Sequence, residues 1–246
     1  MKDKKKIIKD KYSQIAGDSS GCGCGCCGSA QNKTISDQIG YSKEEVSQGE
    51  GANLGLGCGN PLALGDITKG ETVVDLGAGA GFDCFLASPK VGEEGKVIGV
   101  DMTEEMVEKA RKNAEVRGAK NVEFILAEIE DLPLKDDSVD AIISNCVINL
   151  SPDKDRVFAE SYRILKLGGR MYVSDIVLLG ELTEEQRNDE DLLTGCVAGA
   201  LRKEDYLTKL KKAGFEVEIV SENKDISKEQ YNGVALESLG VKAVKK

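Results

Sequence analysis

The chain has 246 residues and carries 33 Lys and Arg against 43 Asp and Glu, which gives a formal net charge of −10. This acidic balance argues against a general nucleic-acid binder, because a phosphate lattice repels it, and no apolar run approaches the roughly 18 residues of a membrane span. With 8 Cys and no His, the sequence excludes catalytic and metal sites that need an imidazole. No apolar segment of the signal-peptide kind follows the Lys-rich start, so we expect a cytoplasmic protein whose partners include neither membrane nor nucleic acid.

Residues 1–36 have the composition of an appendage. A Lys-rich stretch contains apolar residues at near-helical spacing, Ile7, Ile8, Tyr12 and Ile15, which predict a short amphipathic helix. The segment GDSSGCGCGCCGSAQN follows, and its Gly and Ser offer no side chains for a core. It contains the cysteines Cys22, Cys24, Cys26 and Cys27. We expect residues 1–36 to form a helix and a flexible Cys-rich segment, and residues 37–246 to form one domain.

Strands and helices alternate from residue 72 onward. A polar and then glycine-rich stretch at 37–60 precedes them and predicts a loop, with a short helix beginning at Pro61. The expected strands span residues 72–76, 96–101, 122–127, 139–144, 170–175, 216–222 and about 233–238. The expected helices span residues 83–88, 104–117, 153–165 and 202–213, and Gly168-Gly169 is expected to end the third. The alternation predicts right-handed βαβ units and a mostly parallel sheet with helices on both faces.

The clearest local signal is the run VDLGAGAGF at residues 74–82. Gly77, Gly79 and Gly81 follow the first expected strand and precede a helix, a context in which a ligand can approach the backbone closely. Asp101 ends the second expected strand, where a carboxylate can accept hydrogen bonds from both hydroxyls of a ribose. A dinucleotide fingerprint would need glycine at position 82, which is Phe82. The alternative is a glycine turn without a ligand.

The pattern D-x-G-x-G-x-G, which begins at Asp75, resembles the class I S-adenosylmethionine-dependent methyltransferases. The segments AEIEDLP at 127–133, DSVDAIISN at 137–145 and RILKLGGRMYV at 163–173 resemble later parts of the same fold, over about residues 60–225. The resemblance implies a Rossmann-like class I methyltransferase fold with a seven-stranded, mostly parallel sheet. It also implies S-adenosylmethionine as cofactor. The residues implied as cofactor contacts are Asp75, Gly77, Gly79, Gly81, Asp101, Met102, Glu128, Ile129 and Asn145.

Three cysteines fall at the loops expected to face that cofactor. Cys58 lies in the loop before the first strand, Cys146 follows the fourth strand, and Cys196 lies in LLTGCVAGAL after the fifth. Three convergent thiols fit a soft, thiophilic ligand, whereas zinc usually takes four such ligands. The competing interpretation is that each thiol only packs in the core, as free cysteines often do.

Taken together, the segments EGANLGLGCGNP, DLGAGAGFDC, VDMTEEM, SNCVINL and LLTGCVAGAL resemble the arsenite S-adenosylmethionine methyltransferases. The resemblance implies that Cys58, Cys146 and Cys196 bind trivalent arsenic (arsenite or its thiol conjugates) for detoxification. It further implies that Cys84 takes part in a disulfide relay, with thioredoxin or glutathione as the external reductant. A metalloid held by three thiolates keeps a lone pair for the methyl group, so the site needs no general base.

Two other functions stay open from the residues. One is a methyltransferase for a small organic acceptor such as a quinone, sterol or thiol, with cysteines that only pack. The other is a non-catalytic metalloid-binding protein in which the Cys-rich tail is the chelator. Larger members of the family carry a further C-terminal domain, whereas here about 20 residues follow the sixth expected strand. We expect them to form one strand and a basic tail, VKAVKK, and no second domain.

Overall fold

The computed structural model describes residues 4–17, 35–49, 51–224 and 234–246. Seven strands form one sheet in the order β3-β2-β1-β4-β5-β7-β6. Their bounds are β1 Thr72–Leu76, β2 Lys96–Asp101, β3 Val122–Leu126, β4 Val139–Asn145, β5 Leu165–Leu178, β6 Phe215–Asn223 and β7 Leu236–Lys245. The pairs from β3 to β5 are parallel, and β7 runs antiparallel to both β5 and β6. The expected seven-stranded, mostly parallel sheet is therefore confirmed.

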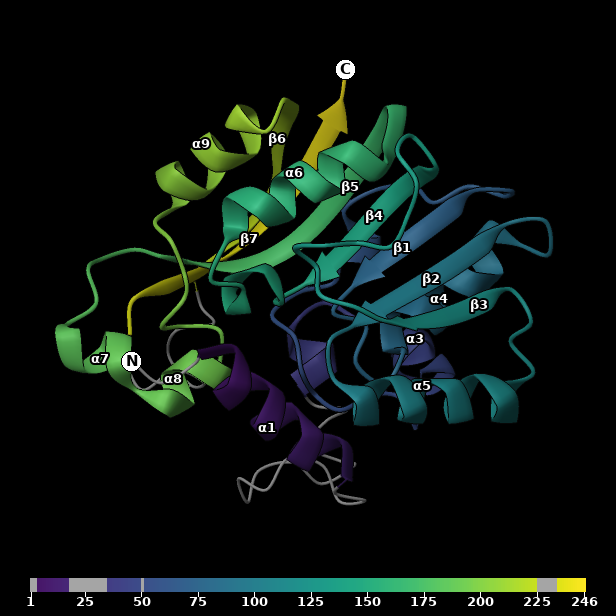
Figure 1. The fold of residues 1–246 in the computed structure, drawn as a ribbon, viewed down its shortest axis with the longest axis horizontal. Helices are drawn as coiled ribbons and strands as arrows, with labels where there is room; N and C mark the ends of the chain where they lie inside the picture. Colours follow the sequence, from purple (N-terminus) through teal and green to yellow (C-terminus); the bar gives the residue numbers. More distant parts are fainter. Residues whose placement is uncertain (1–3, 18–34, 50, 225–233) are drawn as a thin grey trace.

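Helices cover both faces of this sheet (Figure 1). One face is covered by α3 Lys43–Gln48, α4 Phe82–Val91 and α5 Glu104–Arg117, and the other by α6 Lys154–Ile164 and α9 Lys203–Lys212. Successive residues of β1 point to opposite faces, so Val73 packs in the first apolar cluster and Val74 in the second. The strand order reverses between β1 and β4, the place where doubly wound sheets bind their ligands.

Two expectations about the carboxyl-terminal half are wrong. Helix α6 ends at Ile164, because Leu165 is fully buried in extended backbone and pairs with Val139. Strand β5 therefore runs through Gly168-Gly169, which were expected to end the helix. The last strand is β7 at 236–245 instead of 233–238. Its VKAVKK segment is no tail, since Val241 and Ala243 are buried against β5 and β6.

The short elements of the structure lie around the carboxyl edge of the sheet. The 3-10 turns η1 Pro61–Ala63 and η2 Ile148–Leu150 follow the loops of Cys58 and Cys146, and the first confirms the short helix expected at Pro61. The helices α7 Glu184–Asn188 and α8 Glu190–Thr194 come before Cys196 and, like α3, were not expected.

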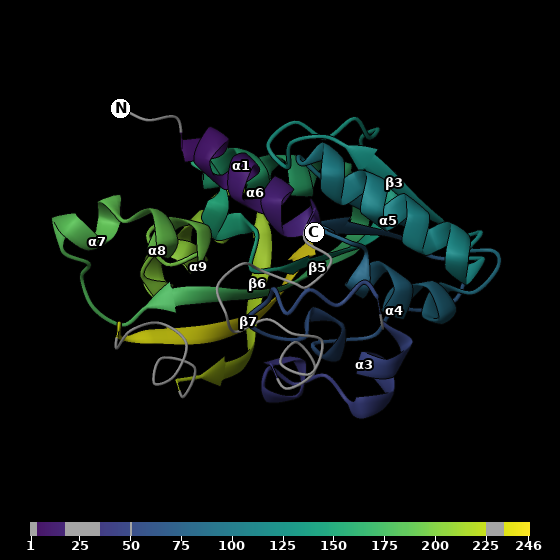
Figure 2. The same cartoon turned by 90° about the horizontal axis from the view of Figure 1, so that it is seen from below.

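The N-terminal helix α1 Lys4–Gly17 confirms the expected amphipathic helix and packs against α5 and α8 (Figures 1 and 2). Its residues Ile8 and Ile15 are buried in the core of the domain. The cysteines at 22, 24, 26 and 27 lie outside the described residues, and the division of the chain at residue 36 stays a prediction. Within the described part of the chain, every helix is too short or too polar to cross a bilayer.

Candidate active site

The glycine loop between β1 and α4 has the backbone that only glycine adopts readily. Gly77, Gly79 and Gly81 have φ values of 70°, 52° and 93°, in the left-handed region. A Cβ at Gly77 would meet Val147 and one at Gly81 would meet Phe124, so both positions also need close packing. At Gly79 a Cβ would meet no atom within 4 Å. The loop thus leaves open space beside its middle glycine.

Asp101, at the end of β2, lies directly beside that open space. Its carboxylate accepts hydrogen bonds from the N–H of Gly79 at 3.0 Å and from the N–H of Thr103 at 2.9 Å. Burial raises the pKa of this carboxyl, although these two hydrogen bonds oppose the rise. The open position at Gly79 and the fixed carboxylate fit the ribose of a nucleoside cofactor, because a carboxylate can accept both of its hydroxyl protons.

The other expected cofactor contacts lie around the same edge. Met102 follows Asp101 and packs against the cluster of the three cysteines. Glu128 follows β3 and accepts a hydrogen bond from Lys5 of α1 at 2.6 Å. Ile129 is buried on the face covered by α6 and α9. The structure therefore brings the ends of β1, β2 and β3 together, while the contact of each residue with a cofactor stays a prediction.

A network of polar side chains connects the end of β4 with the first turn of α4, which follows the glycine loop. Asn145, at the end of β4, donates to the Tyr41 hydroxyl at 2.9 Å and to the carbonyl of Gly59 at 2.8 Å. The Tyr41 hydroxyl in turn donates to Asp83 at 2.7 Å, and burial raises the pKa of Asp83 to about 6. Asn145 also accepts from the N–H of Cys58 at 3.1 Å. It therefore joins β4, the loop of Cys58 and the first turn of α4.

The side chains of Cys58, Cys146 and Cys196 lie in one buried cluster with exposed fractions of 3%, 7% and 5%. The Cys58 thiol donates to the carbonyl of Ser174 at 3.5 Å, and the Cys196 thiol donates to the carbonyl of Cys146 at 2.7 Å. Cys146 and Cys196 have φ values of 59° and 67°. A left-handed backbone is unfavourable for residues with a Cβ and tends to occur at functional sites. The structure therefore places the three thiols that the sequence singled out in one buried cluster.

The ligand atoms are closest among Cys58, Cys146 and the carboxylate of Asp175, which lie within 4.8 Å of one another. Cys196 lies outside this closest group of ligand atoms and donates its thiol proton to the Cys146 carbonyl at 2.7 Å. Asp175, on β5, accepts from Asn149 at 2.7 Å and from Tyr206 at 3.1 Å. Burial raises the pKa of this carboxyl to about 7. The sequence interpretation missed Asp175, whose signal was an acidic residue in an apolar strand.

All three thiols are protonated at neutral pH in this arrangement. Burial raises the pKa of Cys58, and the charge of Asp175 adds to the rise. For Cys146 the hydrogen bond with Cys196 lowers the pKa, but the contact with Cys58 and burial outweigh it. For Cys196 the contact with Cys146 and burial both raise the pKa. Each thiol therefore carries a proton that can leave together with a leaving group of an incoming ligand.

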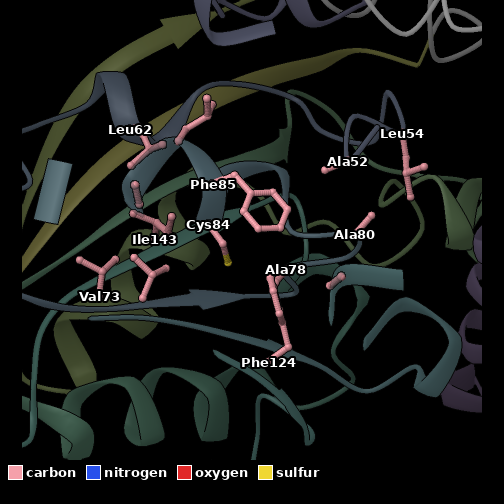
Figure 3. Close-up of a cluster of buried hydrophobic side chains, with 14 of the residues drawn as sticks. Ala52, Leu54, Leu62, Val73, Ala78, Ala80, Cys84, Phe85, Phe124 and Ile143 are labelled. Carbon is pink, nitrogen blue, oxygen red and sulfur yellow. The ribbon is translucent and has the colours of Figure 1, made fainter. Parts of the chain in front are cut away.

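Cys84 lies away from the other three, on α4 among Phe85, Ala78 and Ile143 (Figure 3). Its thiol is fully buried and donates to the carboxylate of Asp75 at 3.2 Å. Burial and the charge of Asp75 raise the pKa of this thiol well above its usual value. The four described cysteines are all free thiols. The structure does not bring Cys84 to the three cysteines that the sequence predicts as arsenic ligands, and its relay role stays a prediction.

Comparisons with known proteins bear on this site. A model of the methyltransferase domain family matches residues 67–214. An arsenite methyltransferase of Halobacterium salinarum is 47% identical over 224 residues, which are 86% of this chain and 57% of the relative. The human arsenite methyltransferase is 43% identical over 168 residues, which are 65% of this chain and 44% of the relative. The chain thus spans about half the length of these curated relatives.

A solved structure agrees with these relatives. It is an arsenic(III) S-adenosylmethionine methyltransferase from Chlamydomonas reinhardtii, 35% identical to this chain, with a TM-score of 0.65. The matched region covers 87% of this chain and 73% of the algal one.

Proposed function

Because the chain belongs to the family of arsenic(III) S-adenosylmethionine methyltransferases, we propose that it methylates trivalent arsenic held by Cys58, Cys146 and Cys196. The observation that carries the proposal is the convergence of these three buried thiols beside the ends of β1, β2 and β4. S-adenosylmethionine is the methyl donor of this family, and we assign its ribose to the open space at Gly79 beside Asp101. The role of the activity is arsenic detoxification in the cytoplasm.

The protonated thiols are the right reagents for arsenite. Arsenite carries three hydroxyl groups, and each thiol can replace one of them by forming an S–As bond. The thiol proton leaves with the hydroxyl group as water, so three thiols release three waters and no net proton. The raised pKa values of Cys58, Cys146 and Cys196 keep these protons available at neutral pH. Binding therefore needs no imidazole.

Capture by three thiols requires a movement of Cys196. Cys58 and Cys146 are already close, whereas Cys196 is held by its hydrogen bond to the Cys146 carbonyl. Displacing that hydrogen bond frees the Cys196 sulfur to complete the trigonal site. The Cys58 thiol also donates to a carbonyl, that of Ser174, but at 3.5 Å this contact is longer than the 2.7 Å contact of Cys196. We infer that Cys196 binds the metalloid last.

The chain then contributes positioning and the exclusion of water. Bound S-adenosylmethionine supplies a sulfonium methyl carbon, and the lone pair of trivalent arsenic is the nucleophile for it. Asp101 and the glycine loop hold the donor side, and the three thiolates hold the acceptor side at the adjoining strand ends. Fixing the two partners this way converts an encounter in solution into a reaction within one complex. The buried thiol cluster keeps water from the arsenic.

Turnover requires a reductant, because arsenic that has gained a methyl group in this way is pentavalent. Two protein thiolates supply two electrons and become a disulfide, and the arsenic returns to the trivalent state. Two thiols of thioredoxin or glutathione then reduce this disulfide by exchange. Cys84 is a candidate for one of the two protein thiols, in which case α4 must move relative to the arsenic site.

The proposal is tested with purified protein in which the cysteines at 22, 24, 26 and 27 are replaced by Ser. The protein receives arsenite, S-adenosylmethionine and a thiol reductant, and S-adenosylhomocysteine is measured. We expect turnover that depends on arsenite, with Cys146→Ser and Cys196→Ser inactive but unchanged in cofactor binding by calorimetry. Turnover without arsenite, or full activity of Cys146→Ser, would contradict the proposal and favour an organic acceptor.

A further inference from the structure

The N-terminal helix α1 is attached to the loops of the candidate active site at several points. Lys5 forms ion pairs with Glu128 and Glu130, at 2.6 and 3.0 Å, in the segment after β3. Ser13 donates to Glu105 at 2.8 Å, in the first turn of the helix that follows Asp101. These partners lie more than 90 residues along the chain from α1. The helix therefore lies over the carboxyl edge of the sheet, between α5 and α8 (Figure 1).

The buried face of α1 points at the cysteines. Ile8 has an exposed fraction of 1% and packs in the cluster of Cys58, Cys146 and Cys196. Tyr12, one helical turn later, packs against the same cluster. Its hydroxyl donates to the carbonyl of Thr194 at 3.2 Å, two residues before Cys196. The phenol thus lies beside the loop that carries the Cys196 thiol.

We propose that Tyr12 is a positioning residue of the arsenic site, whose hydroxyl directs the Cys196 sulfur toward the metalloid. The inference rests on the proposed function, since it assigns a role toward arsenic held by that sulfur. In the structure the Cys196 thiol proton goes to the Cys146 carbonyl and the Tyr12 proton to Thr194. Once arsenic has replaced the thiol proton, the sulfur only accepts, and the Tyr12 hydroxyl turns from Thr194 to donate to it.

The Tyr12 hydroxyl is held beside the loop of Cys196, because the phenol packs against the cluster of the three cysteines and donates to the carbonyl of Thr194. Residues 4–17 are then part of the arsenic site, although their composition suggested an appendage.

The test is Tyr12→Phe, which keeps the ring and removes only the hydroxyl. A hydrogen bond of this kind contributes on the order of a tenfold change in affinity. We expect arsenite to bind about tenfold more weakly and its KM to rise about tenfold, with kcat changed much less. The affinity for S-adenosylmethionine, measured by calorimetry without arsenite, stays unchanged. The protein again carries Ser at the four tail cysteines.

Two control variants separate the hydroxyl from other effects. Tyr162→Phe removes a hydroxyl that donates to the carbonyl of Lys246 at 3.3 Å, far from the site, and should bind arsenite normally. Ser13→Ala weakens the docking of α1 but keeps Tyr12. If Ser13→Ala loses as much arsenite affinity as Tyr12→Phe, docking of the helix is responsible and the inference is wrong.

The remaining outcomes distinguish this inference from the proposed function. If the protein with Tyr12 binds arsenite through Cys196 and Tyr12→Phe binds it equally well, the inference fails and the proposed function stands. If Cys196→Ser binds arsenite as well as the unaltered thiol does, the proposed function itself fails. A selective loss in Tyr12→Phe, absent from both control variants, supports the inference.

Discussion

Two glycines with similar positive φ values offer a matched test of where the cofactor binds. Gly79 in the glycine loop and Gly118 at the end of α5 have φ values of 52° and 63°, and a Cβ at either would meet no atom within 4 Å. Gly79→Ala and Gly118→Ala should therefore have the same cost to folding. Only the first adds a methyl group to the space assigned to S-adenosylmethionine.

The two costs can be estimated separately. A left-handed Ala is about 1–2 kcal/mol less favourable than Gly, and in a chain of 246 residues each kcal/mol lowers Tm by about 2–4 °C. Both variants should show this loss in the absence of cofactor. A methyl group forced against a bound ligand costs a further ~1–3 kcal/mol, which weakens binding roughly 5- to 150-fold.

Thermal unfolding and calorimetry of S-adenosylmethionine binding measure the two costs. We expect equal Tm losses and a loss of cofactor affinity confined to Gly79→Ala. If Gly79→Ala binds the cofactor as tightly as Gly118→Ala, the space beside Gly79 is not the cofactor site and the reasoning is refuted.

Three further predictions concern stability and pH. Arg170 binds Glu71 through two hydrogen bonds of 2.6 and 2.7 Å, which outweigh burial and lower the pKa of Glu71. Glu71→Gln should lower the free energy of unfolding by about 2 kcal/mol at pH 7. Since the folded-state pKa is lowered, this advantage of the unaltered chain should vanish as the pH falls below about 4.5; a loss independent of pH in urea denaturation would contradict it. Cys84→Ala should lower the free energy of unfolding by about 1–3 kcal/mol, because Asp75 loses its hydrogen-bond donor. The variant should nevertheless bind arsenite with unchanged affinity in a titration. Weaker binding would place Cys84 among the ligands. The pKa of Asp175 rises from 3.8 to about 7 on folding, so its protonation favours the folded state. Denaturation from pH 4 to 8 should show the stability of the native chain falling between about pH 4 and 7 relative to Asp175→Asn and then levelling off; a parallel course throughout would refute the raised pKa.

The centre of the fold was predictable because its elements are short apolar or periodic runs bounded by glycines. The strands at 72–76 and 96–101 and the helix at 104–117 have the expected bounds. The bounds of the last strand were not predictable. Its lysines suggested a solvated tail, whereas its burial comes from pairing with β5 and β6. The end of α6 was misplaced because Gly168-Gly169 can lie in a strand as well as after a helix.

The site was predictable only where its residues sit at strand ends. The order of the strands places Gly79, Asp101 and Cys146 at one edge, so their grouping follows from the sequence pattern. The contacts of Tyr12 and Asp175 depend on how distant segments pack, and a periodic pattern does not specify them. Tyr12 lies on the same helical face as Ile8 and Ile15. This spacing indicates that the face is buried, but it does not indicate which part of the protein the face packs against.

The most direct measurement of the central claim is the number of sulfur neighbours around bound arsenic. X-ray absorption at the arsenic edge counts them in the protein that carries Ser at residues 22, 24, 26 and 27. The account predicts three sulfur neighbours, and two in Cys196→Ser. Two sulfurs and one oxygen with Cys196 intact, the set that Cys58, Cys146 and Asp175 would provide, would contradict it.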